Sequence, residues 1–224
     1  MAFLRSGLFE DAEPVIEGRR VRLRPYLTTD YPAWAELRAQ SRQHLQPWEP
    51  LWPHDDLTKL AYRHRLRHYH REAREDLGYA FAIIGKDSGS ILGGLSLCNI
   101  RRGVTQSAIL GYWLGLPYVG HGLMTEAVGT LLPHAFEVIR LHRIEAVTQP
   151  HNMPSIRVLE HCGFTREGYL RQAIKTASRA VLQIGFETAC CTDALDRWRI
   201  EADDYTVAKA RIQCREAGHQ RAGI

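Results

Sequence analysis

Residues 111–127 read Gly-Tyr-Trp-Leu-Gly-Leu-Pro-Tyr-Val-Gly-His-Gly-Leu-Met-Thr-Glu-Ala, and this stretch decides the fold. A strand that ends at a turn around Pro117 is followed by a Gly120-His121-Gly122 loop, which leads directly into a helix. Glycines let backbone N–H groups come close to an anion, and a helix start adds unpaired donors and the positive end of the helix dipole. The pattern predicts a phosphate-binding loop, although a tight turn with a helix cap would have the same sequence.

Two common phosphate-binding motifs do not fit these residues. A P-loop needs a lysine directly after its last glycine, and the sequence has Leu123 there. A dinucleotide-binding fingerprint needs a third glycine where Thr125 stands, together with a βαβ unit near the start of the chain. The loop therefore belongs to a different class of binding site.

Composition sets only broad limits on function. The 224 residues are 45% hydrophobic and 24% charged, which is typical of a globular protein. The net charge of +4 weakly favours an anionic ligand and is too small to indicate nucleic-acid binding by itself. The five cysteines are odd in number and have no CxxC spacing, as in proteins with free thiols. With no signal peptide or membrane span predicted, we expect a cytoplasmic protein.

The first half of the chain alternates between strands and helices. A strand is predicted over residues 20–27, followed by a helix that carries Trp34 and ends near His44, and by a second helix over residues 55–75. Three further strands are predicted at residues 79–84, 91–100 and 106–114. Their short links are typical of antiparallel neighbours.

The second half of the chain begins with a predicted helix. Apolar residues recur at helical spacing from Met124 to Ile139, and Pro133 should kink this helix. A strand at 143–148, a helix at 152–162 and strands at 165–172 and 180–188 follow. This order predicts one mixed α/β domain over residues 19–189. Residues 1–18 are expected to form an N-terminal segment, and residues 190–224 a C-terminal tail.

Three blocks of sequence resemble the GNAT acetyltransferases, and in particular their Rim-type branch, which acetylates N-terminal amines of ribosomal proteins. Residues 118–127 (YVGHGLMTEA) are similar to the loop that binds the coenzyme A pyrophosphate, and residues 152–164 (NMPSIRVLEHCGF) to the second signature of the family. Residues 44–50 (HLQPWEP) are similar to the substrate-side loop of the branch. The resemblance runs from about residue 20 to residue 171. It implies a single GNAT-like domain with a central, mostly antiparallel, splayed sheet flanked by helices.

The resemblance also implies acetyl-CoA as cosubstrate, no metal, and a protein N-terminus as acceptor. The implied cosubstrate-binding residues are Trp113, Leu114, Val119, Gly120, His121, Gly122, Leu123, Met124, Thr125, Asn152 and Ser155. A splayed strand at residues 112–114 would offer backbone donors to the pantetheine arm, although Trp113 could equally be a core residue. Asn152 could bind the pantetheine amides or simply cap its helix.

Acetyl transfer also needs a neutral amine and a donor for the departing thiolate. We expect Glu49 to act as the general base, because partial desolvation between two tryptophans suits a carboxylate to that role. Trp48, Glu49 and Tyr112 are expected to bind the acceptor. Ser155 is expected to donate to the thioester sulfur. An exposed loop carboxylate and a solvent-facing serine are the plainer alternatives for Glu49 and Ser155.

The sequence departs from the family pattern at several positions. Val119 and His121 replace residues that are usually polar or basic, which predicts weaker CoA binding, with backbone donors still in place. Leu159 stands where many members have a tyrosine general acid, and residues 180–183 (AVLQ) differ from the strand that usually follows.

The helix at residues 55–75 is rich in arginine and histidine. His64 and His68 are four residues apart, but no carboxylate or cysteine completes a metal site nearby, so a solvated basic face is expected. Arg63, Arg65, Arg67 and Arg71 are predicted to attract RNA or an acidic protein. Two other functions stay open: acetylation of a small-molecule amine, and a catalytically silent CoA-binding module. A monomer and a homodimer both fit the sequence.

Overall fold

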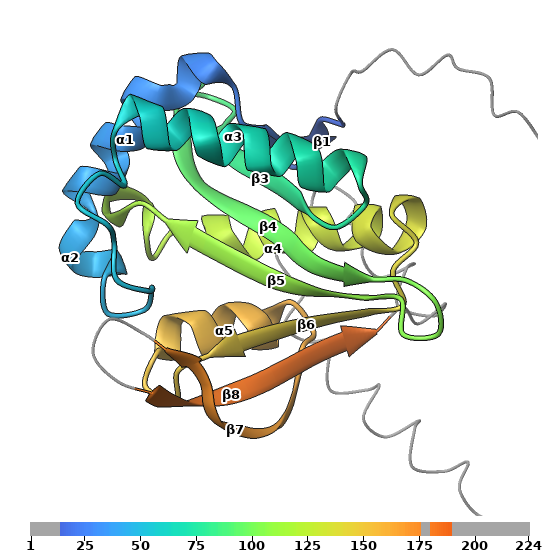
Figure 1. Ribbon diagram of the computed structural model, residues 1–224. Coiled ribbons are helices and arrows are strands. Elements are labelled where there is room, and N and C mark those ends of the chain that lie inside the picture. Colours follow the sequence, from blue (N-terminus) through green and yellow to red (C-terminus); the bar gives the residue numbers. More distant parts are fainter. Residues whose placement is uncertain (1–13, 176–179, 190–224) are drawn as a thin grey trace, which may run out of the picture.

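The computed structural model describes residues 14–175 and 180–189 of the chain. The described strands are β1 (Ile16–Glu17), β2 (Val21–Pro25), β3 (Tyr79–Gly85), β4 (Ile91–Arg101), β5 (Ser107–Leu114), β6 (Arg143–Thr148), β7 (Thr165–Lys175) and β8 (Ala180–Ala189). The described α-helices are α1 (Tyr31–Gln40), α2 (Arg42–Leu45), α3 (Lys59–Arg74), α4 (Leu123–Pro133) and α5 (Met153–His161). Figure 1 shows them as one mixed α/β fold.

The strands form one sheet in the order β1-β2-β3-β4-β5-β6-β8-β7. Neighbouring strands are antiparallel, except that β5 and β6 run parallel. The helix α4 connects these two parallel strands, as a crossover connection requires. The predicted antiparallel meander of β3, β4 and β5 is confirmed.

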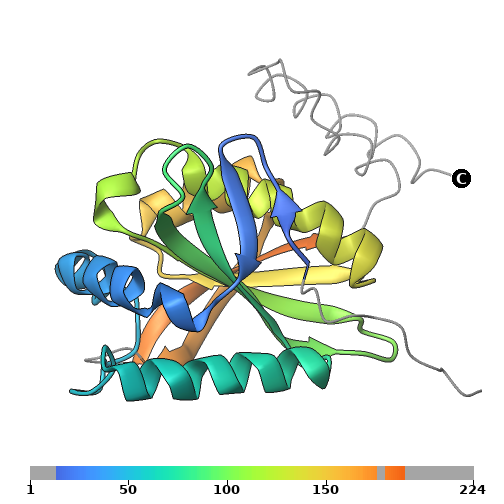
Figure 2. The same cartoon turned by 90° about the horizontal axis from the view of Figure 1, so that it is seen from above.

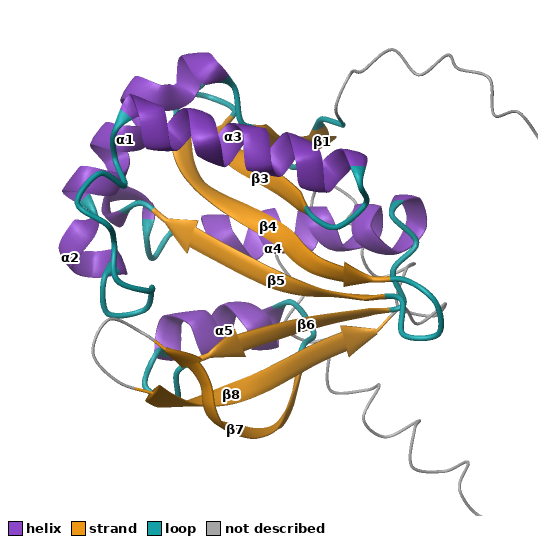
Figure 3. Cartoon of the chain, viewed as in Figure 1, coloured by secondary structure: helices purple, strands orange, loops and turns teal. Residues whose placement is uncertain are grey.

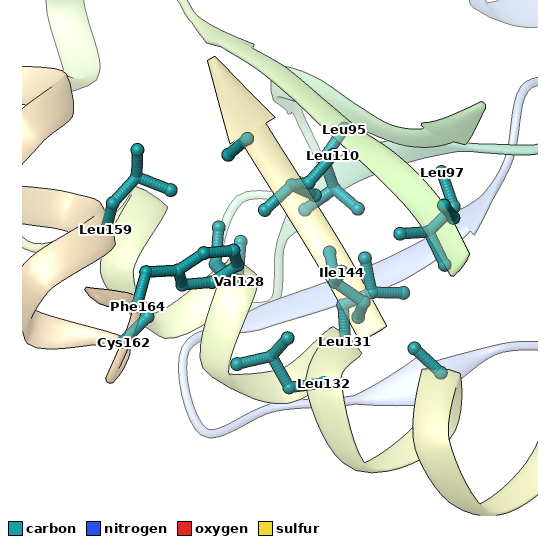
Figure 4. Packing of buried hydrophobic residues seen from close by; sticks show 14 of the residues in the cluster. Leu95, Leu97, Leu110, Val128, Leu131, Leu132, Ile144, Leu159, Cys162 and Phe164 are labelled. Carbon is teal, nitrogen blue, oxygen red and sulfur yellow. The ribbon is translucent and has the colours of Figure 1, made fainter. Parts of the chain in front are cut away.

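Helices cover both faces of the sheet, as Figures 2 and 3 show. Buried residues of α4 and α5 pack on one face together with the inward side chains of β2 to β6. On the other face, Trp34 of α1 and Tyr62 of α3 pack over a smaller cluster from β3 and β4. The larger cluster is drawn in Figure 4, where Val128, Leu131 and Leu132 of α4 lie against Leu110 and Ile144 of the strands.

The two parallel strands separate after only four pairs of residues. Their register runs from Ser107 opposite Arg143 to Leu110 opposite Ala146 and then stops, whereas β5 continues to Leu114 and β6 to Thr148. Beyond Leu110, β5 remains paired with β4 on its other side, up to Leu114 opposite Gly93. The sheet is therefore splayed between β5 and β6, as predicted.

Two helix boundaries differ from the sequence prediction. The helix α3 begins at Lys59 rather than at residue 55, because the Thr58 side chain accepts a hydrogen bond from Ala61 N and caps the helix there. The first predicted helix is broken at Ser41, whose hydroxyl accepts from the Leu116 N–H and ties α1 to the end of β5.

The predicted kink at Pro133 is a change of helix type. The α-helix α4 ends at Pro133, and a π-helical turn, η3 (His134–Val138), continues from it. Proline has no N–H to donate, so the regular hydrogen-bond ladder cannot pass through it. Within the described residues, no helix is both long and apolar enough to span a membrane.

Candidate active site

The Gly-x-Gly loop has the backbone geometry that a phosphate cradle requires. Gly120 and Gly122 have φ angles of 80° and 73°, a left-handed region that side chains other than glycine rarely adopt. A Cβ on Gly120 would meet nothing within 4 Å, so the outer side of the loop is open. Gly122 is the N-cap of α4, and within the described residues no side chain caps this helix start. Its first N–H groups are therefore available to an anion.

Several apolar side chains around the loop pack into the core. Met124 is buried in the larger core cluster, and Leu123 and Leu114 pack against it. His121 and Gly120 are exposed, and Val119 and Thr125 are half-buried. Loop residues 120–125 therefore offer a ligand mainly their backbone, as the sequence predicted for this segment.

The Glu126 side chain binds the start of β2 and the residue before it. Its carboxylate accepts hydrogen bonds from the backbone N–H of Arg20 at 2.5 Å and from Arg20 Nε at 2.7 Å. Arg20 Nη1 in turn donates to the His121 carbonyl at 3.1 Å. The ion pair anchors the loop to β2 and places a guanidinium beside Gly122, whose added Cβ would lie 3.7 Å from Arg20 Nη2.

Two neighbouring aromatic residues of β5 point to opposite faces of the sheet where the strands separate. Trp113 lies on the α1 side, with its ring 4.9 Å from the guanidinium carbon of Arg38. Tyr112 packs against the larger core cluster, and its hydroxyl lies 2.8 Å from Ser155 Oγ. Burial raises the pKa of Tyr112 well above its usual range, and the hydrogen bond with Ser155 opposes this in part. The Trp113 side chain therefore lies on the α1 side of the sheet, and the Tyr112 side chain on the α5 side.

The start of α5 lies across the splay from β5. The Asn152 side chain accepts a hydrogen bond from Ser155 N at 3.3 Å and so caps this helix. The capping role that the sequence left open for Asn152 is thus present in the structure. Ser155 is half-buried in the first turn rather than facing solvent. Leu159, the position of the missing tyrosine, is 1% exposed and belongs to the core.

Glu49 is held by a buried arginine that the sequence analysis did not single out. Arg38 Nη1 and Nη2 donate to the two carboxylate oxygens of Glu49 at 2.9 and 2.7 Å, and Trp52 Nε1 donates to Glu49 Oε2 at 2.6 Å. The side chains of Arg38 and Glu49 are 8% and 23% exposed. Glu49 is therefore partly desolvated beside Trp52, as expected, but both of its oxygens are already hydrogen-bonded.

Arg38 also lies between aromatic rings from separate parts of the chain. Its guanidinium carbon is 4.2 Å from the centre of the Trp52 ring and 4.9 Å from that of Trp113. Such close contacts stabilise a cation over an aromatic face. The helical spacing of Trp34, Leu37 and Arg38 places Arg38 on the apolar face of α1, and this was the signal in the sequence that could have identified it.

Trp48 contacts the segment before α5. Its ring lies 5.2 Å from that of His151, and the neighbouring Pro47 carbonyl accepts from Gln149 Nε2 at 3.0 Å. The substrate-side loop is therefore fixed at two points, to the residues before Asn152 and, through Arg38, to Trp113 of β5. The structure brings the three sequence blocks together around the splay between β5 and β6.

The basic helix α3 is only partly as predicted. Arg63, Arg67 and Arg71 are exposed, but Arg65 turns inward, pairs with Asp56 at 2.8 Å and lies 5.4 Å from the Trp34 ring. Arg65 is on the same face as Tyr62 and Leu66, which explains its inward direction. Among the described residues, no group of three or more His, Cys, Asp or Glu side chains could hold a metal ion.

Comparisons with known proteins give a consistent result. Residues 20–165 match the model of the acetyltransferase (GNAT) domain. The probable N-acetyltransferase YjcK of Bacillus subtilis is 34% identical over 72% of this chain and 89% of its own. The [ribosomal protein uS5]-alanine N-acetyltransferase of Escherichia coli is 31% identical over 67% of this chain and 78% of its own.

A solved structure extends the similarity to three dimensions. Mycobacterium smegmatis RimJ, in complex with CoA-disulfide, has a TM-score of 0.77 and 27% sequence identity. The match covers 91% of this chain and 96% of that chain. The fold described above is therefore shared with a protein whose structure contains coenzyme A.

Proposed function

Because the chain belongs to the GNAT acetyltransferase family, we propose that it moves an acetyl group from acetyl-CoA to the N-terminal amine of a protein, with a ribosomal protein as the acceptor. The chain is an N-acetyltransferase of Rim type. The observation that carries the proposal is the meeting of the open Gly120–Gly122 loop, the splay between β5 and β6 and the Glu49 loop at one place.

The described residues fit acetyl-CoA as the cosubstrate. Backbone N–H groups of residues 120–125 would hold the pyrophosphate, because two left-handed glycines and an uncapped helix start lie together there. The backbone of residues 112–114 would hold the pantetheine arm, since that edge of β5 has left β6. Asn152 already caps α5 through its side-chain oxygen, which leaves its amide group as the part that would reach the pantetheine.

Direct attack of the amine on the thioester carbonyl fits these groups. The amine nitrogen forms the new C–N bond, the C–S bond breaks with its electron pair going to sulfur, and the proton lost by nitrogen reaches the thiolate through a base and water. We assign the base to Glu49 and the donor to the sulfur to Ser155. The products are the acetylated amine and free CoA thiol.

Two arguments support a protein N-terminal amine as the acceptor: the pKa of such an amine and the name of a relative. A protein N-terminal amine has a reference pKa of about 7.7–8.0, against about 10.4 for lysine. An N-terminal amine is therefore partly neutral at physiological pH and needs less help from a base than lysine does. The Escherichia coli relative is named as an alanine N-acetyltransferase of ribosomal protein uS5, which supports a ribosomal protein as the acceptor. Such an acceptor would place the enzyme in the cytoplasm.

The exposed arginines of α3 support a weak contact with RNA. Arg63, Arg67 and Arg71 project from a helix whose acidic member, Glu72, lies 3.4 Å from His68. Phosphate contacts of this kind weaken with salt. If Arg63→Ala and Glu36→Ala weakened the binding of an RNA duplex equally, the exposed arginines of α3 would be excluded as the RNA-binding site.

Measuring CoA thiol release from acetyl-CoA separates the candidate functions. Peptides that begin with Ala, Ser or Thr should stimulate release, and the same peptides with a blocked N-terminus should not. Faster release with polyamines or aminoglycosides would favour the small-molecule alternative. The silent CoA-binding alternative would be favoured if CoA raised the melting temperature and no amine stimulated release. Leu159 is buried in the core and has no hydroxyl, so the donor to sulfur is assigned to Ser155 in this chain.

A further inference from the structure

The hydrogen bond between Tyr112 and Ser155 joins the two sides of the splayed sheet. Tyr112 lies two residues beyond Leu110, the last β5 residue opposite β6. Ser155 is in the first turn of α5, which follows β6 in the chain. The two hydroxyl oxygens are 2.8 Å apart, and the Tyr112 hydroxyl is 3.3 Å from the Ser155 carbonyl. The contact therefore lies where the thioester is expected to enter.

The direction of this hydrogen bond decides what Ser155 can do. A serine hydroxyl has one proton and can also accept. If Ser155 donated to Tyr112, its proton would not be available to a sulfur atom. If Tyr112 donates to Ser155 Oγ rather than to the Ser155 carbonyl, Ser155 Oγ accepts and Ser155 keeps its own proton for another acceptor. Of the two acceptors near the Tyr112 proton, Ser155 Oγ at 2.8 Å lies within the usual O–H···O range and the Ser155 carbonyl at 3.3 Å lies beyond it, so the Tyr112 hydroxyl donates to Oγ. Burial raises the pKa of Tyr112, so this hydroxyl keeps its proton.

The backbone fixes Ser155 from the other side. Its N–H donates to the Asn152 side chain at 3.3 Å, which holds the first turn of α5. The Tyr112 hydroxyl then restricts rotation of the Ser155 side chain. A donor that is held in place before the reaction stabilises developing charge better than one that must reorient.

We infer that Tyr112 is a positioning residue, which donates to Ser155 Oγ and so directs the Ser155 proton to the sulfur of the leaving thiolate. The inference rests on the proposed acetyl transfer. In this arrangement Ser155 stabilises the electron pair that sulfur receives when the C–S bond breaks. The proton that finally makes the thiol is the one lost by the amine. Tyr112 itself neither gains nor loses a proton.

A double-mutant cycle tests this role. We expect Tyr112→Phe to lower kcat roughly tenfold, as loss of an indirect hydrogen bond should, and to leave the CoA dissociation constant unchanged. Ser155→Ala should lower kcat more. The double variant should be no slower than Ser155→Ala alone, because Tyr112 acts through that serine.

Tyr79→Phe is the matched control. Tyr79 is also a half-buried strand tyrosine whose hydroxyl makes a hydrogen bond, to Asp76 at 3.0 Å, and it belongs to β3. The Tyr79→Phe variant should have the same kcat as the unchanged protein. Additive losses in the double variant would overturn the inference and leave the proposed function standing. Absence of thiol release by the unchanged protein with every free peptide would overturn both.

Discussion

Arg38 donates to both carboxylate oxygens of Glu49, at 2.9 and 2.7 Å, while its guanidinium carbon lies 4.2 Å from the Trp52 ring and 4.9 Å from that of Trp113. Trp113 belongs to β5 at the splay, whereas Glu49 belongs to the substrate-side loop and Trp52 follows that loop in the chain. One side chain therefore connects the two predicted binding regions of the enzyme.

Replacing Arg38 by methionine should destabilise the protein by about 3 kcal/mol, because removal of one partner leaves a poorly solvated charge. It should also raise the acceptor KM, since the loop loses its contact with β5. Arg42→Met is the control: Arg42 is exposed and lies 5.5 Å from the same Trp52 ring. Urea unfolding measures the stabilities. Equal losses in the two variants would contradict the role given to Arg38.

Glu49→Gln should lower kcat by about 10²–10⁴-fold, the usual range for a general base, with unchanged CoA affinity. The loss should shrink as pH rises, because the acceptor amine is then already neutral. Glu36→Gln, which changes an exposed carboxylate of α1 hydrogen-bonded to Gln40, should keep full activity. Full kcat with a raised acceptor KM in Glu49→Gln would make Glu49 a recognition residue instead.

Gly122→Val should weaken CoA binding, because its side chain would stand in the cradle. The substitution also strains the backbone, since Gly122 has a φ of 73°. Gly103 is a matched control with a φ of 70° and nothing within 4 Å of an added Cβ. Gly103→Val should lose similar stability and keep its CoA affinity by calorimetry. Equal affinities in the two variants would mean that the loop is not the cradle.

Asp76 gives a prediction for acid stability. Its hydrogen bonds with Arg102, and to a smaller extent that with Tyr79, lower the pKa of its carboxyl group below the usual value. A lowered folded-state pKa adds stability above the unfolded-state value, and this stability is lost as pH falls through the folded-state pKa. Asp76→Asn should therefore flatten the fall in melting temperature on acidification. Asp87→Asn, in the exposed turn before β4, should not.

The parts of the fold that follow local rules were predictable from the sequence. The β3–β5 meander follows from alternating residues and short turns, and the start of α4 from glycines that permit positive φ. The roles of arginines were not predictable in the same way. Arg38 and Arg65 are charged residues in helices and so suggest solvent exposure, yet each lies against a tryptophan from another part of the chain and pairs with a carboxylate of a nearby loop. Only tertiary contacts create such partners.

In the candidate site, too, local motifs were predictable from the sequence and tertiary partners were not. The sequence motifs identified the Gly120–Gly122 loop and Glu49, while the partners of Glu49 and Ser155 came from α1 and β5. The direction of Trp48 toward His151 also depends on how the loop packs against the segment before α5. The side chains of residues 180–183 lie outside the described part of the chain, so the effect of that altered segment stays a prediction.

One measurement tests the proposed function most directly. A peptide that begins with a free alanine and contains an internal lysine is incubated with acetyl-CoA and the enzyme, and mass spectrometry locates the acetyl group while free thiol is counted. We predict acetylation of the N-terminal amine alone, with one thiol released for each acetyl group transferred. Acetylation of the lysine, or thiol release without an acetylated peptide, would contradict the account.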